Sequence, residues 1–338
     1  MKAHYLVRFG EPSVAFEMRE VQVPMPGKGE VRIRVHAFGL NYADVMARQG
    51  LYRGCPPLPC VLGYDVEGVI DEVGEGVSEF RTGDSVFALC RFGGYAEYVV
   101  TTALAVGKLP GGSAPGHGCA LAVQGVTAYH SAIHVQTLMP GEKVLIHAAA
   151  GGLGTSLIQI AHAKGCEVIG VVGGNEKVRY LQSLGVAHII NHHEGDYVGY
   201  VRKFLNGKVD VVFDNIGGSS IKKSISILAP GGRIISIGAA ALSGKKGKLN
   251  LIRLALGFGL FSPIPFLGKS QAFIGINMLK LADDRPDVIA AAFNGTQQLI
   301  EEGILVPHVG KIFPHEELAA AHQFVTDRKA IGKVVVTW

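Results

Sequence analysis

The chain has 338 residues, of which 48% are hydrophobic and 18% are charged, and its formal net charge is +4. This composition excludes an intrinsically disordered protein, and the length is sufficient for two domains with separate hydrophobic cores. The positive charge is spread along the chain, and only residues 245–248 form a local basic cluster, so no nucleic-acid partner is expected.

The five cysteines form no Cys-x-x-Cys pair, which argues against a disulfide framework and against a structural zinc site. The N-terminus begins directly with the alternating pattern of a strand and lacks the apolar core of a signal peptide. Both features predict a cytoplasmic protein with reduced thiols.

The segment 254–267 is almost entirely apolar and raises the question of membrane contact. A membrane-spanning helix needs roughly 20 residues, and this shorter segment also contains Pro263 and Pro265. We expect it to form a wall of a substrate pocket or a contact between subunits. Peripheral membrane contact is a less favoured alternative.

Up to about residue 120 the chain shows no helical periodicity. Short runs of alternating polar and apolar residues, such as 30–36 and 66–74, are separated by turns rich in Gly, Pro and Asp. These runs predict an antiparallel, β-rich, barrel-like domain over residues 1–124.

From residue 125 onward, strand patterns alternate with helical patterns. Strands are predicted at 143–148, 167–172, 188–190, 209–213, 232–237 and 272–277. Helices are predicted at 153–164, 175–184, 196–205 and 219–227. Repeated strand–helix units with short connections predict an α/β domain with a doubly wound parallel sheet over residues 125–278.

The last part of the chain has a different pattern. Helical periodicity at 285–302 and 315–326 leads to a final strand at 333–338. Because no helix follows this strand, residues 279–338 are predicted to return to the first domain.

The most informative segment is an apolar run, 144–148, that continues into a glycine-rich turn and a helix. The turn has the pattern Ala149-x-Gly151-x-x-Gly154, in which alanine replaces the first glycine of Gly-x-Gly-x-x-Gly. Glycines in such a turn let the backbone approach a pyrophosphate, and the N-terminus of the helix offers free N–H groups to the phosphate. Together with the flanking strand and helix, the turn predicts a dinucleotide-binding site.

The second strand of this domain ends in Gly173 and Gly174, where NAD-binding proteins usually carry an Asp or Glu that bonds the ribose 2′-hydroxyl. Without that carboxylate, and with Lys177 close by, a 2′-phosphate is attracted rather than repelled. His192 follows the third strand and is a second candidate for this phosphate. We therefore predict NADPH as the cofactor, although Glu176 is a counter-argument and a solvated helix position is the alternative for Lys177.

Short motifs occur in order along almost the whole chain. They are GLNYAD at 39–44, GLY at 50–52, GYDVEGV at 63–69, RTGDSVF at 81–87, GGYAEY at 93–98, QGVTAY at 124–129, HAAAGGLG at 147–154, FDNIGG at 213–218, PGGR at 230–233, PHVGKIFP at 307–314 and GKVV at 332–335. This set resembles the zinc-independent quinone oxidoreductases of the medium-chain dehydrogenase/reductase superfamily, and within them the subgroup of vesicle amine transport protein homologues. The resemblance implies a GroES-like barrel domain and a Rossmann domain that binds NADPH.

The same resemblance argues against a catalytic zinc ion. The zinc alcohol dehydrogenases of the superfamily carry Cys where this chain has Asn41, and a His-Glu pair where it has Tyr64-Asp65. Asn and Tyr are poor zinc ligands, and the four-cysteine structural lobe is missing. His130 and His134 are four residues apart but have no evident third ligand, so we interpret them as packing and surface residues.

Without zinc, the expected reaction is hydride transfer from NADPH to an acceptor that is already electrophilic, such as a quinone. By resemblance, Asn41 lies near the nicotinamide, Tyr52 and Tyr64 line the substrate entrance, and Asp44 is a further catalytic candidate. A packed aromatic ring with a satisfied hydroxyl is the alternative for both tyrosines. The cofactor contacts that the resemblance implies are Asn41, Thr127, Gly151, Gly152, Leu153, Gly154, Gly173, Gly174, Lys177, His192, Asn215, Gly217, Gly238, Gly275, Asn277 and Lys333.

The sequence leaves three functions open. The favoured one is an NADPH-dependent quinone oxidoreductase, and the second is an enone or enoyl reductase with the same chemistry on another acceptor. The third is a nucleotide-binding, membrane-associated protein with little turnover. A strand at 273–276 on the edge of a sheet suits pairing with a second subunit, so a homodimer is expected.

Overall fold

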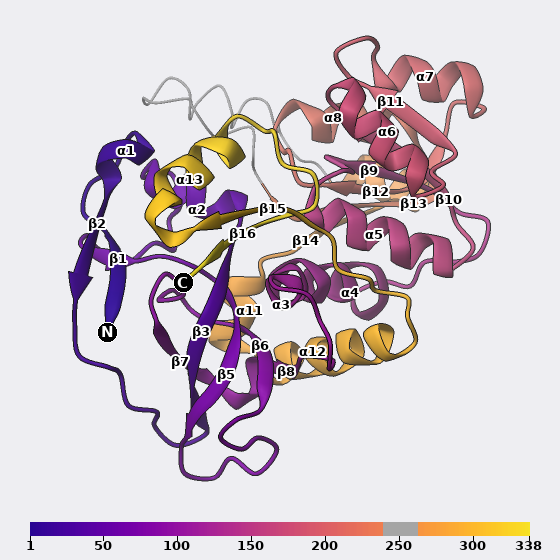
Figure 1. Cartoon of the computed structure of the whole chain (residues 1–338). Helices are drawn as coiled ribbons and strands as arrows, with labels where there is room; N and C mark the ends of the chain where they lie inside the picture. Colours follow the sequence, from indigo (N-terminus) through magenta and orange to yellow (C-terminus); the bar gives the residue numbers. More distant parts are fainter. Residues whose placement is uncertain (239–262) are drawn as a thin grey trace. The chain divides into compact units, whose positions relative to one another are not determined.

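The computed structural model describes residues 1–238 and 263–338 and divides into two compact units. Unit 1 comprises Met1–Thr127 and Met278–Trp338, and unit 2 comprises Ala128–Asn277. Figure 1 identifies the elements of each unit by label and by colour along the chain. The basic cluster at 245–248 and the part of the apolar segment before residue 263 lie outside the described residues.

Unit 1 contains the antiparallel β-rich domain that the alternating runs predict. Its larger sheet has seven strands, in the order β15-β16-β3-β5-β6-β8, with β7 also pairing with β3. These strands are β3 (Glu30–Leu40), β5 (Asp65–Val73), β6 (Ser85–Leu89), β7 (Tyr98–Thr102), β8 (Val106–Lys108), β15 (Val309–Pro314) and β16 (Lys333–Thr337). A smaller sheet consists of β1 (Lys2–Leu6), β2 (Phe16–Glu20) and β4 (Cys60–Val61). The C-terminal strand β16 pairs antiparallel with β3 and therefore belongs to the sheet of this unit.

The helices of unit 1 are mostly short. They are α1 (Pro12–Ala15), α2 (Tyr42–Arg48), α3 (His117–Ala120), α11 (Met278–Asp284), α12 (Pro286–Glu301) and α13 (Leu318–Thr326), and α4 (Val126–Tyr129) begins where the unit ends. The sequence pattern does not predict α1, α2, α3 or α11, because helices of four to seven residues complete at most two turns and show little periodicity.

Unit 2 is the predicted Rossmann-like domain. Its six strands are all parallel and follow the order β11-β10-β9-β12-β13-β14. They are β9 (Lys143–His147), β10 (Glu167–Val172), β11 (His188–Asn191), β12 (Val209–Asp214), β13 (Leu228–Ser236) and β14 (Ala272–Gly275). The helices are α5 (Gly152–Ala163), α6 (Asn175–Ser183), α7 (Tyr197–Phe204), α8 (Ser219–Ile227) and α10 (Ile264–Lys269). Two departures from the prediction are helix α10, which the sequence pattern does not predict, and β13, which starts four residues earlier than expected.

Helices cover both faces of the sheet of unit 2, which makes it doubly wound. Ile169 on β10 packs in one cluster with Val201 of α7 and Ile221 of α8. The next residue, Gly170, faces the opposite side, where an added Cβ would collide with Leu181 of α6. A parallel sheet covered on both sides needs strands of continuous apolar residues, which is the pattern observed in β9 and β10.

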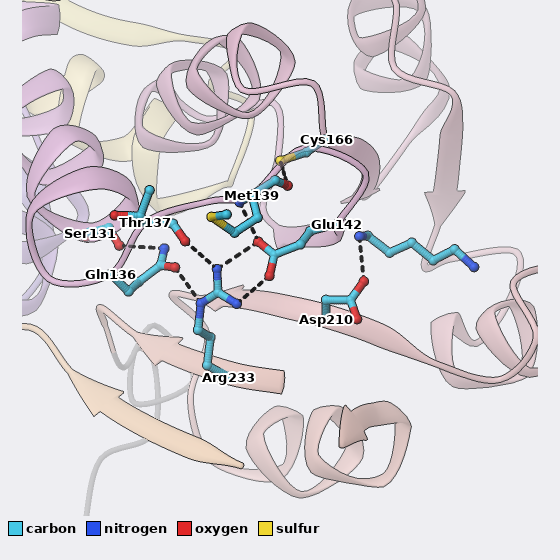
Figure 2. Close-up of polar contacts among 9 residues, drawn as sticks. Ser131, Gln136, Thr137, Met139, Glu142, Cys166, Asp210 and Arg233 are labelled. Carbon is cyan, nitrogen blue, oxygen red and sulfur yellow. Dashed lines mark hydrogen bonds and ion pairs between the residues drawn. The ribbon is translucent and has the colours of Figure 1, made fainter. Parts of the chain in front are cut away.

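One polar cluster, which we call the Arg233 clamp, ties β13 to the segment that leads into β9. The Arg233 guanidinium donates to both carboxylate oxygens of Glu142, at 2.6 and 2.8 Å, and to the Thr137 carbonyl at 2.8 Å. Gln136 accepts a further bond from Arg233 and donates to the Ser131 carbonyl. Figure 2 shows these side chains converging on the guanidinium. The clamp therefore holds residues 136–142 against the sheet through a bidentate ion pair.

Across the two described stretches of the chain, every helix is too short or too polar to cross a membrane.

Candidate functional site

In unit 1 a buried polar cluster joins β3, α2, β5 and β16. Lys333, at the start of β16, donates from Nζ to Asn41 Oδ1 at 2.9 Å and forms an ion pair with Asp65. Asn41 Nδ2 donates to the other oxygen of Asp65, Oδ1, at 3.0 Å. The side chains of Lys333 and Asp65 are both 0% exposed. A buried charge is tolerated only when it is paired and hydrogen-bonded, so these three side chains depend on one another.

Gly39 leaves the space that this ammonium occupies. A Cβ at position 39 would lie 2.8 Å from Lys333 Nζ and 2.9 Å from Asp65 Oδ1. Any side chain there would push the ammonium away from its carboxylate. The glycine on β3 is therefore a steric requirement of the ion pair.

Asp44 lies beside this cluster, in the first turn of α2. Its Oδ2 accepts the backbone N–H of Asn41 at 2.8 Å, which caps the helix. Burial raises the pKa of the Asp44 carboxyl to about 7; the Asn41 N–H opposes this shift, and the nearby charge of Asp65 adds to it. A carboxyl with this pKa can gain or lose a proton near neutral pH, as a general acid or base must.

Tyr52 and Tyr64 form an edge-to-face pair with ring centroids 6.0 Å apart, and Tyr64 also contacts Phe92 at 4.9 Å. Burial raises the pKa of both phenols, and the nearby charge of Asp44 raises that of Tyr64 further. Both hydroxyls therefore stay protonated at neutral pH and are available as hydrogen-bond donors. Thr127 is buried, and its hydroxyl donates to the Val123 carbonyl at 2.6 Å.

In unit 2 the predicted glycine-rich turn leads directly from β9 into α5. The helix begins at Gly152 and has no capping side chain. Its first backbone N–H groups therefore have no side-chain acceptor at the N-cap position. A Cβ on Gly154 would lie 2.5 Å from the Ala149 carbonyl oxygen, so only glycine allows the helix to pack this closely on the preceding turn. This geometry suits a phosphate at the helix N-terminus.

The end of the next strand, β10, carries the glycines Gly173 and Gly174 and lies beside two imidazoles. A Cβ on Gly173 would lie 2.8 Å from His192 Nε2 and 2.7 Å from His193 Nε2. The two histidine rings are 4.3 Å apart. The Gly174 N–H donates to Asn191 Oδ1 at 3.1 Å, which fixes the turn. His193 is not among the predicted residues, although the His-His doublet directly after a strand is a signal in the sequence.

The remaining predicted cofactor residues of unit 2 lie at the same edge of the sheet. Asn215 and Gly217 follow β12, where the Asp214 carboxylate accepts the Gly217 N–H at 2.9 Å. Gly238 follows β13, and Gly275 ends β14. Asn215 Oδ1 is buried without a hydrogen-bond partner among the residues described. The carboxyl ends of parallel strands are where open α/β sheets bind ligands, so this edge is the candidate dinucleotide site.

Two observations concern metals. The rings of His130 and His134 are 5.1 Å apart, and burial lowers the pKa of His130 to about 4, followed by a smaller effect of His134. Within residues 1–238 and 263–338, no three His, Cys, Asp or Glu side chains form a group that could hold a metal ion.

Comparisons with known proteins agree with this arrangement. Residues 27–111 match the alcohol dehydrogenase GroES-like domain, and residues 152–293 match the zinc-binding dehydrogenase family. Human quinone oxidoreductase is 32% identical over 99% of this chain and 97% of its own length. The human synaptic vesicle membrane protein VAT-1 homolog is 34% identical over 97% of this chain and 84% of its own.

The chain belongs to the quinone oxidoreductase family of medium-chain dehydrogenases/reductases. It is therefore an oxidoreductase. Escherichia coli quinone oxidoreductase complexed with NADPH superimposes with a TM-score of 0.85 at 26% identity, covering all of both chains. CurK enoyl reductase superimposes with a TM-score of 0.85 at 28% identity, covering 99% of each chain.

In this family member, some of the predicted residues of unit 1 lie in one polar cluster, and the predicted glycines and Asn215 of unit 2 lie at the carboxyl ends of the parallel strands. Unit 1 brings together Asn41, Asp44 and Lys333, and adds Asp65, which the sequence analysis treats only as a position lacking a zinc ligand. Gln124 is a second addition, because its Nε2 lies 3.4 Å from Asn41 Oδ1. Its position in the QGVTAY motif was the only sequence signal. The roles of these residues in catalysis and cofactor binding stay predictions.

Proposed function

We propose that this oxidoreductase reduces quinones with NADPH and uses no zinc ion. The observation that carries the proposal is the buried ammonium of Lys333, which is bonded to both Asn41 and Asp65. In the zinc alcohol dehydrogenases of the same superfamily, the positions of Asn41, Tyr64 and Asp65 carry metal ligands.

The ammonium supports zinc independence because it already compensates the charge of Asp65. A divalent cation at this place would have to displace Lys333 from a site where both side chains are 0% exposed. It would also meet an amide and a phenol in place of thiolate and imidazole. The cluster therefore supports the interpretation that the ammonium of Lys333, and not an exchangeable metal ion, provides the positive charge at this place.

NADPH is supported by the geometry at the strand ends of unit 2. The N-terminus of α5 would hold the pyrophosphate, and the buried Asn215 Oδ1 still lacks a donor among the described residues. His192 and His193 beside Gly173 would hold the 2′-phosphate, with Lys177 in the first turn of α6. Bound NADPH supplies the hydride.

The side chains of unit 1 would provide the proton and the orientation. Reduction of a quinone to a hydroquinone takes a hydride and one proton. Asp44 can hold that proton near neutral pH, and the hydroxyls of Tyr52 and Tyr64 can donate to a carbonyl oxygen. Lys333 fixes the carboxamide of Asn41 and acts as a positioning residue.

The test is oxidation of NADPH and NADH against para-benzoquinone, phenanthrenequinone and an alkenal, with and without a zinc chelator. Faster turnover with NADPH than with NADH, with a quinone and unaffected by chelation, supports the proposal. Loss of activity on chelation, with recovery on adding zinc, contradicts zinc independence.

A second function is favoured by the likeness to CurK enoyl reductase. If only the alkenal is reduced, the protein is an enone reductase, which uses the same hydride chemistry. The likeness to the VAT-1 homolog favours a third function, a nucleotide-binding protein with little turnover. Tight NADPH binding without turnover of any acceptor, and pelleting with lipid vesicles, would support that function.

We also propose a homodimer in the cytoplasm. The apolar residues Ile264 and Leu267 on α10 are 75% and 82% exposed. Exposed apolar side chains of this kind suit a contact with a second copy. Light scattering of the purified protein would measure a monomer mass if this proposal is wrong.

A further inference from the structure

Two cysteine side chains meet in the loop between α2 and β5. Cys55 Sγ lies 3.9 Å from Cys60 Sγ. All five cysteines lie in the described part of the chain, and this is the only contact between two thiols there. A disulfide needs a separation of about 2.05 Å, so the two sulfurs have to move closer by roughly 2 Å, which a rotation about χ1 can supply.

The two thiols have different surroundings. Cys55 is half-buried and reachable from solvent, whereas Cys60 is 7% exposed and lies in β4. The neighbouring Cys60 thiol lowers the pKa of Cys55, while the contact with Cys55 and burial both raise the pKa of Cys60. Because an oxidant in solution reaches the half-buried Cys55 and not the buried Cys60, Cys55 is the attacking thiol, and Cys60 attacks the oxidised Cys55 in the second step.

The other three cysteines lack these features. Cys90 and Cys119 are 0% exposed, and burial raises the pKa of both thiols well above the usual value. Cys166 in unit 2 is 9% exposed, and its thiol donates to the Met139 carbonyl at 3.4 Å (Figure 2). A soluble oxidant therefore reaches Cys55 first.

We propose that Cys55 and Cys60 form a reversible intramolecular disulfide when the protein meets a hydroperoxide. The Cys55 thiolate attacks the terminal peroxide oxygen, the O–O bond breaks, and an alcohol or water leaves after taking up a proton. The resulting sulfenic acid on Cys55 is attacked by the Cys60 sulfur; the S–O bond breaks, and water leaves with the Cys60 proton. The dithiol loses two electrons, and the peroxide takes them up.

The disulfide would act on the loop that carries Tyr52. The Cys55 N–H donates to the Tyr52 carbonyl at 3.1 Å, so the two residues share one turn. Cys60 pairs with Leu6 across β4 and β1, which anchors it in a sheet. A bond between the two sulfurs would tie the turn of Tyr52 to that sheet and restrict the tyrosine. Only this effect on Tyr52 rests on the proposed function, in which the Tyr52 hydroxyl donates to a carbonyl oxygen of the acceptor.

The first experiment detects the bond itself. The full-length protein is treated with hydrogen peroxide, alkylated with iodoacetamide and digested with trypsin, which cleaves after Arg53 and Arg81 and leaves both cysteines in peptide 54–81. We expect this peptide to lose two hydrogens and escape alkylation, and to become alkylated after treatment with dithiothreitol. Full alkylation after peroxide would overturn the proposal, as would a disulfide that involves other cysteines.

Variants locate the reaction. C55S should lose both the disulfide and the fast reaction with peroxide, whereas C60S should accumulate a sulfenic acid that a dimedone probe labels. C166S is the matched control, because serine keeps a donor for the Met139 carbonyl, and its peptide 54–81 should oxidise as in the natural chain. Equal labelling of the C55S and C60S variants would contradict the assigned roles.

The effect on function is measured separately. Oxidation should raise the KM for the acceptor severalfold and leave the Kd for NADPH unchanged, and dithiothreitol should reverse the change. An unchanged KM would contradict the proposed effect of the disulfide on acceptor binding. Whether the disulfide forms is still decided by the mass of peptide 54–81. If no acceptor is turned over at all, the proposed function fails, and the modification is judged from the peptide alone.

Discussion

The ion pair between Arg233 and Glu142 in unit 2 and the ion pair between Lys333 and Asp65 in unit 1 differ in how they are held. In unit 2 the side chains of Arg233 and Glu142 are 14% and 17% exposed, and the guanidinium is bonded to a carboxylate, an amide and a carbonyl. In unit 1 the side chains of Lys333 and Asp65 are 0% exposed, and Asn41 is the one other partner of the ammonium among the residues that the structure describes.

The difference indicates different purposes. A bidentate arginine pair near the surface ties two segments together at a modest desolvation cost. A fully buried lysine pair is an inefficient way to stabilise a fold, because removing both charges from water costs several kcal/mol. Its position among the predicted catalytic residues supports a role in the site, so the two pairs should respond differently to substitution.

The largest effect is expected for Lys333→Met. This change leaves the Asp65 carboxylate buried and unpaired, which should lower the free energy of unfolding by about 3–5 kcal/mol. Urea unfolding measures this loss. If the single variant does not fold, the D65N/K333M double variant should recover most of the stability, because it removes both charges.

Activity separates the two roles of Lys333. We expect kcat/KM of the D65N/K333M variant to stay about a hundredfold below that of the natural chain, because Asn41 loses the bond that orients it. Full recovery of kcat/KM in the double variant would show that the pair only stabilises the fold.

The second prediction concerns the carboxyl beside the lysine pair. The pKa of Asp44 is raised in the folded state, so the folded protein binds more protons than the unfolded one between pH 4 and pH 7. Its stability relative to D44N, which cannot ionise there, should therefore fall as pH rises through this window, by about 4 kcal/mol at most. Urea unfolding of both proteins across this pH range measures the difference.

Glu142 is the matched control, since its pKa shifts in the opposite direction. Burial alone would raise its pKa, but the hydrogen bonds from Arg233 and Met139 and the charge of Arg233 lower it overall. The stability that Glu142 contributes is present at neutral pH and is lost as pH falls through its lowered pKa. The E142Q variant should therefore approach the natural chain at acid pH, and a parallel course of D44N and E142Q would contradict the comparison.

The third prediction tests the Arg233 clamp. Arg233→Met should lower the free energy of unfolding by about 2 kcal/mol, because the charged hydrogen bonds to Glu142 are lost. Arg233→Lys keeps the charge without the planar fork and should cost less. In both variants kcat/KM should stay close to that of the natural chain, and a large loss of kcat/KM without a loss of stability would assign the clamp to the site.

The smallest effect is expected at the open end of β10. His193→Ala should weaken binding of NADP⁺ by about fivefold and leave binding of NAD⁺ and the free energy of unfolding unchanged. Titration calorimetry with both nucleotides measures the two affinities. His162→Ala, which removes an exposed imidazole from α5, is the matched control and should change neither. Equal losses for NADP⁺ and NAD⁺ would exclude a contact with the 2′-phosphate.

The two units also differ in how far the sequence predicts them. The turn from β9 to α5 is predictable because the apolar strand, the glycines and the helix are adjacent in the chain. In unit 1 the resemblance indicates Asn41, Asp44 and Lys333, but the contact between Lys333 and Asp65 is not predictable, because these two residues are 268 residues apart and meet only through strand pairing. The place of Asp44 in the first turn of a helix is also not predictable, because α2 has only seven residues and shows little periodicity.

Gly39 also leads to an expectation for the sequences of related proteins. Because a Cβ at this position would meet both Lys333 and Asp65, we expect the residue at position 39 to depend on whether position 333 is lysine. Chains with lysine at the second position should carry glycine at the first, and chains that acquire a larger residue at 39 should lose the lysine. This covariation would let a protein with a built-in cation be distinguished from a metal-dependent one by reading two residues.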